Sequence, residues 1–67
     1  MIALWVNGTR DRVEDDASLA SVLADRGVSP AEVSVLLNGT AIPRDALQAH
    51  GLQCDDRVDF VHFHGGG

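Results

Sequence analysis

The residues best suited to chemistry stand at the end of the sequence, where VHFHGGG occupies residues 61–67. Glycine has no side chain to contribute to a core, and its backbone is costly in entropy to hold in one conformation. A terminal glycine nevertheless presents an unhindered carboxylate, and the glycines before it can pass through a channel too narrow for any Cβ atom. We therefore predict that Gly65, Gly66 and Gly67 form a flexible tail that enters the active site of a partner.

Chemistry at Gly67 requires activation, because a carboxylate is a poor electrophile until one of its oxygens becomes a leaving group. Adenylation with ATP and Mg held by a partner is the simplest route. The glycines do not connect a strand to a helix as those of a GxGxxG or Walker loop do, so we predict no cofactor bound by this chain. The sequence shows neither a Ser-His-Asp arrangement nor a paired-carboxylate motif. The chain is expected to be a co-substrate and not an enzyme.

Cys54, His62 and His64 raise the possibility of a metal site, because imidazole and thiolate are good zinc ligands. The sequence offers no second cysteine, and ligands on a mobile chain end make a poor site. We predict no metal site, and we interpret His62 as a rim residue and His64 as a contact of the tail. Cys54 is interpreted as a packed or exposed thiol, with a covalent link to a cysteine of a partner as the alternative.

The composition limits the classes of partner and the location. The 67 residues suffice for one small domain, and the net charge of -5 with scattered arginines disfavours nucleic acid and favours a basic protein surface. The start of the sequence lacks the basic region of a secretory signal, and no segment is long and apolar enough to span a membrane. A single cysteine suits a reducing compartment, so we expect a cytoplasmic protein.

The first half of the sequence predicts a hairpin followed by a helix. Residues 2–6 and 9–13 have the character of strands, and the Asn7-Gly8 pair between them is typical of a tight hairpin turn. Apolar residues then recur with helical spacing in SLASVLADRG, residues 18–27, where serine can cap the start and glycine can close the end. The segment SPAEV, residues 29–33, predicts one helical turn with a capping box between its serine and its glutamate.

The second half predicts two strands that enclose a loop. The apolar run at 33–38 ends at a second Asn-Gly pair and predicts a buried strand. Residues 40–56 are consistent with a loop, a short helical turn and a brief edge strand. Residues 57–64 predict the last strand, with Val61 and Phe63 on the face away from the helix as an apolar strip that docks an activating enzyme.

This order of elements predicts an α+β fold of the β-grasp, ubiquitin-like type. A mixed sheet of four to five strands would carry one main helix across one face. Parallel pairing of the first and last strands would place the tail at one end of the sheet. We predict a single domain over residues 1–64 and a glycine tail over residues 65–67.

Short motifs along the whole chain resemble the ThiS group of sulfur carriers of thiamin biosynthesis. They are LNG at 37–39, IPR at 42–44, DDRV at 55–58, VHF at 61–63 and the terminal glycines. The resemblance implies that an E1-like enzyme of the ThiF or MoeB type adenylates Gly67. It further implies that persulfide sulfur from a cysteine desulfurase or another source displaces AMP, and that the resulting thiocarboxylate donates its sulfur. The thiazole of thiamin, made by a ThiG-type thiazole synthase, is the leading destination.

A thiocarboxylate ionises at a lower pH than a thiol, so it stays anionic and nucleophilic while remaining tethered. The chain departs from the group at His64, where an aliphatic residue is common, at Leu47, where tryptophan is frequent, and at Cys54. These departures leave the sulfur acceptor open. Alternatives are the small subunit of molybdopterin synthase or a carrier for another thiolated metabolite, a ubiquitin-like modifier joined to lysines, and a binding module without terminal chemistry.

Overall fold

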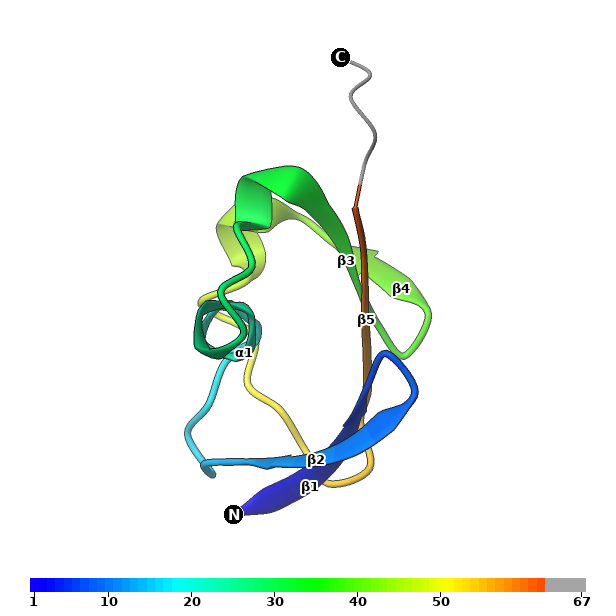
Figure 1. Cartoon of the computed structure of the whole chain (residues 1–67). Coiled ribbons are helices and arrows are strands. Elements are labelled where there is room, and N and C mark those ends of the chain that lie inside the picture. The colour runs from blue at the N-terminus through cyan, green and yellow to red at the C-terminus, as the bar shows by residue number, and fades with distance from the viewer. Residues whose placement is uncertain (63–67) are drawn as a thin grey trace.

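The computed structural model describes residues 1–62, and the predictions for Phe63, His64 and the three terminal glycines lie outside the described residues. A single mixed sheet with the strand order β2-β1-β5-β3-β4 packs against one α-helix (Figure 1). The predicted β-grasp fold is confirmed. The elements are β1 (Ile2–Val6), β2 (Thr9–Val13), α1 (Leu19–Asp25), η1 (Pro30–Glu32), β3 (Val33–Leu37), β4 (Thr40–Ile42), η2 (Arg44–Ala46) and β5 (Arg57–His62), where η denotes a 3-10 turn.

Both Asn-Gly pairs form two-residue hairpin turns. The φ angles are 50° and 82° at Asn7 and Gly8, and 53° and 85° at Asn38 and Gly39. Positive φ at both turn residues matches the right-handed twist of the strands they connect. The first turn joins β1 to β2 as predicted, and the second joins β3 to β4, which is the brief edge strand expected within residues 40–56.

Helix α1 is fixed by hydrogen bonds at both of its ends. The Ser18 hydroxyl accepts from the Ser21 N–H at 3.2 Å, and the Ser21 hydroxyl accepts from the Ser18 N–H at 2.9 Å, which together form a capping box. At the other end Gly27 has a φ of 68° and its N–H donates to the Ala24 carbonyl, while the Val28 N–H donates back into the helix. Gly27 therefore closes the helix in a Schellman motif, as the sequence indicated.

The predicted turn at residues 29–33 forms, but without the predicted capping box. Ser29 caps η1 by accepting from the Ala31 N–H at 3.4 Å, and the Glu32 N–H donates to the Ser29 carbonyl. No bond from the Glu32 side chain back to Ser29 is present in the described residues. The turn ends at Glu32, so this residue belongs to a tight 3-10 turn and not to the N3 position of a continuing α-helix.

The core lies between α1 and the inner face of the sheet. Its fully buried side chains are Leu4, Leu19, Val22, Leu23 and Val58. Leu4 and Val58 come from β1 and β5, and the other three come from α1, so the helix covers the two strands at the middle of the sheet. Because β5 is the central strand, this packing also fixes the element that precedes the glycines.

Asp11 connects the edge strand β2 to the end of α1. Its carboxylate accepts from the Arg12 N–H at 2.8 Å and forms an ion pair with Arg26, the C-cap residue of α1. The Arg12 N–H, and secondly the positive charge of Arg26, hold the pKa of Asp11 below its ordinary value. Asp11 is thus stabilised as a carboxylate, and it also occupies a backbone donor of an edge strand.

Candidate functional site

The candidate site is built on β5, the strand that leads to residues 63–67. On one side β5 pairs in parallel with β1 through Trp5–Arg57 and Val6–Val58, and on the other it pairs antiparallel with β3. Backbone bonds of 2.9 Å run from the Trp5 N–H to the Asp56 carbonyl and from the Asn7 N–H to the Val58 carbonyl. The parallel pairing of the first and last strands is therefore confirmed, and β5 is anchored along both edges at its start.

Two asparagine side chains from the hairpin turns hold β5 in addition to these backbone bonds. The Asn7 Oδ1 accepts from the Phe60 N–H at 2.9 Å. The Asn38 Oδ1 accepts from the Arg57 N–H at 2.9 Å, and its Nδ2 donates to the Asp56 Oδ1 at 3.1 Å. The sequence indicated both residues only as turn formers, because their contacts with β5 depend on a strand register that local patterns do not contain.

The far end of β5 has one neighbouring strand only. Strand β1 ends at Val6, which pairs with Val58, so no residue of β1 lies beside the end of β5. Val61 and His62 therefore pair with β3 alone, opposite Ser34 and Val33. Val61 is 57% exposed and His62 is also exposed. His62 is therefore exposed at the end of the described part of β5, and both its rim role and the docking role of Val61 stay predictions. Phe63, His64, Gly65, Gly66 and Gly67 lie outside the described residues.

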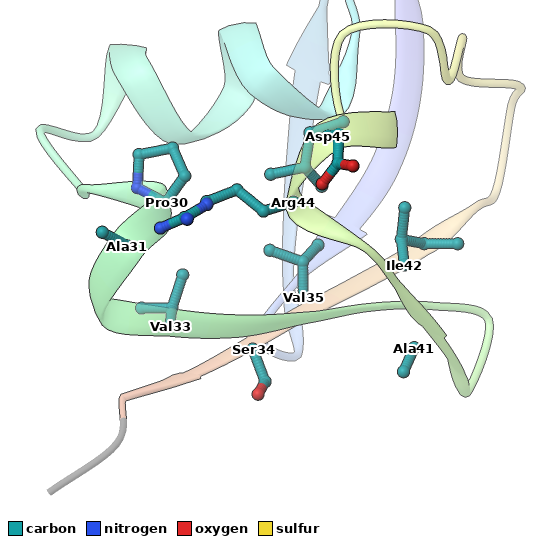
Figure 2. A pocket seen from close by; sticks show the side chains of 10 residues that line it. Pro30, Ala31, Val33, Ser34, Val35, Ala41, Ile42, Arg44 and Asp45 are labelled. Carbon is teal, nitrogen blue, oxygen red and sulfur yellow. The ribbon is translucent and has the colours of Figure 1, made fainter. Parts of the chain in front are cut away.

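The face of the sheet opposite α1 carries the side chains that alternate with the core positions, and we call it the outward face. In Figure 2 the side chains of Ser34 and Ala41 point to the opposite side of the sheet from those of Val33 and Val35. Val33 and Val35 are buried. From the strand registers, the outward face consists of Ala3, Trp5, Arg10, Arg12, Ser34, Leu36, Ala41, Arg57, Asp59 and Val61.

Trp5 and Arg10 form the ordered centre of the β1–β2 end of this face. The Arg10 guanidinium lies 4.9 Å from the centre of the Trp5 ring, and it also pairs with Asp55 at 2.9 Å. Trp5 is 38% exposed. A cation held over an indole ring is attracted by the ring quadrupole, so the exposed tryptophan is kept in one orientation on the surface. Sequence reasoning did not single out either residue.

A hollow of about 340 Å³ opens on the helix side of β3, between η1 and η2. Val33, Val35 and Ile42 form its floor, and the Arg44 side chain extends across it toward Pro30 (Figure 2). Arg44 therefore points away from the outward face. The hollow lies beside the end of β5, because Val33 is paired with His62.

No three potential ligands among His, Cys, Asp and Glu lie together within residues 1–62 in a way that could hold a metal ion. Cys54 is an exposed thiol in the turn before β5, while His62 stands at the other end of the same strand. The structure therefore does not bring these two residues together. Within the same residues, no helix is long and apolar enough to cross a membrane.

The fold and the position of β5 define a ubiquitin-like β-grasp protein whose central strand leads into a glycine-rich end. The model of the ThiS family matches residues 4–67. The chain therefore belongs to the ThiS family, whose members are β-grasp sulfur carriers.

Solved structures and a curated relative agree with this assignment. The crystal structure of the thiamine biosynthesis protein ThiS from Geobacter metallireducens is 33% identical, with a TM-score of 0.83, over 98% of this chain and 100% of that one. The NMR structure of a thiamine biosynthesis protein from the same organism gives 35% identity and a TM-score of 0.76, over 98% of this chain and 88% of that one. SAMP1 from Haloferax volcanii, at 21% identity and a TM-score of 0.61 over 98% of both chains, shares the fold.

The curated relative is a thiazole synthase of Magnetococcus marinus. It is 36% identical over 64 residues, which are 96% of this chain and 20% of that protein. The chain thus spans about a fifth of the length of the curated relative that it matches.

Proposed function

We propose that this chain carries sulfur as a C-terminal thiocarboxylate on Gly67, formed by an E1-like activating enzyme. The observation that carries the proposal is that the ThiS family match extends through the terminal glycines to residue 67. The anchoring of β5 supports it, because a strand fixed by two neighbours and two asparagine side chains gives the following residues a defined starting point.

The proposed reaction has three steps. A carboxylate oxygen of Gly67 attacks the α-phosphorus of ATP on the activating enzyme, and pyrophosphate leaves. The terminal sulfur of a persulfide then attacks the carbonyl carbon of the acyl-adenylate and expels AMP, which leaves an acyl group on a sulfur–sulfur bond. A second thiol reduces that bond, so a thiocarboxylate is released on Gly67 and the thiol is oxidised to a disulfide. ATP with Mg and the persulfide are supplied by the partners.

We further propose that the sulfur is destined for the thiazole of thiamin. The similarity to a segment of a protein named thiazole synthase supports a thiazole synthase as the enzyme that consumes the thiocarboxylate. The names of the Geobacter relatives, which place them in thiamine biosynthesis, support the same destination. A cysteine desulfurase or an equivalent sulfur source would supply the persulfide, in a reducing compartment such as the cytoplasm.

Intact mass measurement tests the proposal. The chain is incubated with the activating enzyme from the same genome, ATP, Mg and a persulfide source that includes a thiol. Replacement of one oxygen by sulfur adds about 16 Da, and fragmentation should place that increment on Gly67. Conjugation to lysines would instead produce a much larger species and indicate a modifier. An unchanged mass in the complete mixture, or a chain that continues past Gly67 without processing, would refute the proposal.

A further inference from the structure

Two Asn-Gly pairs occupy equivalent positions in the fold. Asn7-Gly8 and Asn38-Gly39 each form the two central residues of a hairpin turn, and all four φ angles are positive. Because glycine has no side chain, its backbone nitrogen can approach the side-chain carbon of the preceding asparagine without hindrance. An Asn-Gly pair is therefore prone to spontaneous deamidation, and local structure alone predicts two equivalent sites.

Deamidation at such a pair needs water and no catalyst. The Gly39 nitrogen attacks the Cγ atom of Asn38 and loses its proton, the Cγ–Nδ2 bond breaks, and ammonia leaves, so a five-membered succinimide forms. Water then opens this ring at one of its two carbonyl carbons. The products are aspartate, which keeps the original backbone, and isoaspartate, whose backbone runs through the former side chain. Either product has a carboxylate in place of the carboxamide, so one negative charge is gained and one hydrogen-bond donor is lost.

Contacts with the start of β5 hold the Asn38 side chain away from this reaction. Its Oδ1 accepts from the Arg57 N–H at 2.9 Å, and its Nδ2 donates to the Asp56 Oδ1 at 3.1 Å. A carboxamide that is bonded at both of its polar atoms is not free to rotate toward the Gly39 nitrogen. Deamidation of Asn38 in the folded chain therefore requires a local opening at the start of β5.

The surroundings of Asn38 are acidic. Its Nδ2 is bonded to the carboxylate of Asp56, and Asp55, Arg57 and Asp59 line the hollow beside the turn. A carboxylate at position 38 would face the carboxylate of Asp56 at hydrogen-bond distance. An attractive contact would then become a repulsive contact between like charges, with no donor between them.

Asn7 has no such acidic partner. Its Oδ1 accepts from the Phe60 N–H at 2.9 Å, and its Nδ2 donates to no acceptor within residues 1–62. The hollow beside Gly8 is lined by one acidic and one basic residue, Asp59 and Arg57. An aspartate at position 7 would keep the acceptor for Phe60 and would lose no donor bond. The two turns therefore differ in the consequence of the same reaction.

We infer that Asn38 is a modification site, at which spontaneous deamidation converts a transient opening of β5 into a lasting one. The aspartate or isoaspartate that forms cannot restore the bond to Asp56, so the start of β5 stays released after the reaction. Since β5 leads to residues 63–67, the modification weakens the anchor of the strand that precedes the terminal glycines. The reaction needs no partner, so its tests hold whether or not the proposed function is correct.

The first experiment follows the reaction by peptide mapping and mass spectrometry, since deamidation adds about 1 Da at the modified residue. The wild-type chain is kept under mildly alkaline conditions, once folded and once in guanidinium chloride. In the unfolded chain, residues 7 and 38 should react at rates within about twofold of each other, because their local sequences are alike. In the folded chain, residue 38 should react at least about tenfold more slowly than in the unfolded chain, because only the open fraction reacts.

The variant Asp56→Ala tests the contact that guards the side chain. It removes the acceptor of the Asn38 Nδ2 and should speed deamidation at residue 38 about threefold or more in the folded chain. Residue 7 of the same molecule is the internal control, and its rate should stay within about twofold of the wild-type rate.

The second experiment measures the effect of the modification on β5, with aspartate as the product that keeps the original backbone. In Asn38→Asp, hydrogen exchange of the Arg57 amide should accelerate about tenfold, because one hydrogen bond is lost and two carboxylates face each other. Asn7→Asp is the matched control, and exchange of its Phe60 amide should stay within about threefold of wild type. Wild-type chains deamidated at residue 38, isolated through their additional negative charge, should show the acceleration at Arg57 as well.

A double variant separates this repulsion from a general loss of folding. Asn38→Asp/Asp56→Asn exchanges the two groups, so that an amide again donates to a carboxylate. The side-chain oxygen of the new asparagine can still accept from the Gln53 N–H, as Asp56 does at 2.8 Å. Exchange of the Arg57 amide should return to within about threefold of wild type.

Four results would overturn the inference. Equal rates at residue 38 in the folded and unfolded chains would show that β5 does not guard the side chain. Complete conversion at residue 7 of the folded chain with none at residue 38 would show that residue 38 is not a modification site. Wild-type exchange of the Arg57 amide in Asn38→Asp would show that the product leaves β5 in place. Failure of the double variant to restore that exchange rate would show that Asp56 is not the cause of the release.

Discussion

The side chain of Asn7 accepts a hydrogen bond of 2.9 Å from the backbone N–H of Phe60, which lies 53 residues later in the chain. Asn7 is also the first residue of the β1–β2 turn, with a φ of 50°. One residue therefore forms a local turn and supports the last strand just before the edge of β5 becomes unpaired. This contact ties the geometry of the first hairpin to the position from which residues 63–67 begin.

Asn7→Gly separates the two roles of this residue, because glycine tolerates the positive φ but cannot accept the bond from Phe60. We expect a loss of about 1 kcal/mol in the free energy of unfolding. Hydrogen exchange of the Phe60 amide should accelerate at the same time. Asn7→Asp is the control, since a carboxylate keeps the acceptor and also tolerates positive φ. If the Phe60 amide exchanges at the same rate in Asn7→Gly and Asn7→Asp, the side chain of residue 7 does not hold β5.

Val58 and Val61 provide a matched pair on the same strand. Val58 is fully buried and Val61 is 57% exposed. We expect Val58→Ala to lower the free energy of unfolding by about 2 kcal/mol, and Val61→Ala to change it by less than about 0.5 kcal/mol. Urea denaturation measures both values.

The same pair tests the docking role of Val61, provided that Val58→Ala is assayed at a temperature where it is fully folded. Val61→Ala should raise the KM for carrier activation by about threefold or more, since a contact that is buried only in the complex is lost. Val58→Ala should leave that KM near wild type. The opposite ranking would mean that Val61 contributes nothing to the partner contact.

Short-range sequence patterns were sufficient to predict most of the fold. The strand bounds at 2–6 and 9–13 and the closing of α1 at Gly27 follow from turn and cap chemistry, which acts over a few residues. The capping box between Ser18 and Ser21 was not predicted, because serine at the third helical position is a weaker signal than glutamate.

The candidate site was predicted only in part, because much of it depends on contacts between distant segments. The contact of Asn7 with Phe60 and the grouping of Arg12 with Arg57 on one face both require the strand order β2-β1-β5. The net charge led to the expectation of a basic partner, but net charge is a sum and does not describe any one face. The register places Arg10, Arg12 and Arg57 on the outward face, where Asp59 lies among them and Asp55 pairs with Arg10.

The Asp11 carboxylate predicts how stability depends on acid. Its pKa is lowered in the folded chain, first by the Arg12 N–H and then by Arg26. Protonation of Asp11 is therefore less favourable in the folded chain than in the unfolded chain. The contribution of its carboxylate to the free energy of unfolding is fully present above the pKa of the unfolded chain, and it is lost as the pH falls through the pKa of the folded chain. From about pH 5 downward, the wild type should lose stability more steeply than Asp11→Asn.

Melting temperatures at a series of pH values measure this difference. Asp45→Asn is the control, since Asp45 is exposed and its carboxylate forms no hydrogen bond or ion pair within residues 1–62. Asp45→Asn should follow the wild-type profile. Superposition of the Asp11→Asn and wild-type profiles would show that the contacts of Asp11 do not stabilise the folded carboxylate.

The terminal glycines give the sharpest test of the proposed chemistry, since they can be changed one at a time. Gly66→Ala introduces a Cβ atom into the segment that we propose enters the active site of the activating enzyme. We expect the rate of thiocarboxylate formation, followed by the increment of about 16 Da, to fall by about 100-fold, as a displacement near 1 Å at a reacting centre can cost that much. The melting temperature should not change.

Gly51→Ala is the matched control, because a Cβ atom at Gly51 would meet no other atom within 4 Å and the residue does not adopt positive φ. Its rate of thiocarboxylate formation should equal that of wild type. Gly51 forms an isolated bridge with Ser18 inside the described fold, so this variant controls for a Cβ atom added away from the terminal glycines. Equal rates for Gly66→Ala and Gly51→Ala would mean that no narrow passage receives the glycines, and the role assigned to them would have to be abandoned.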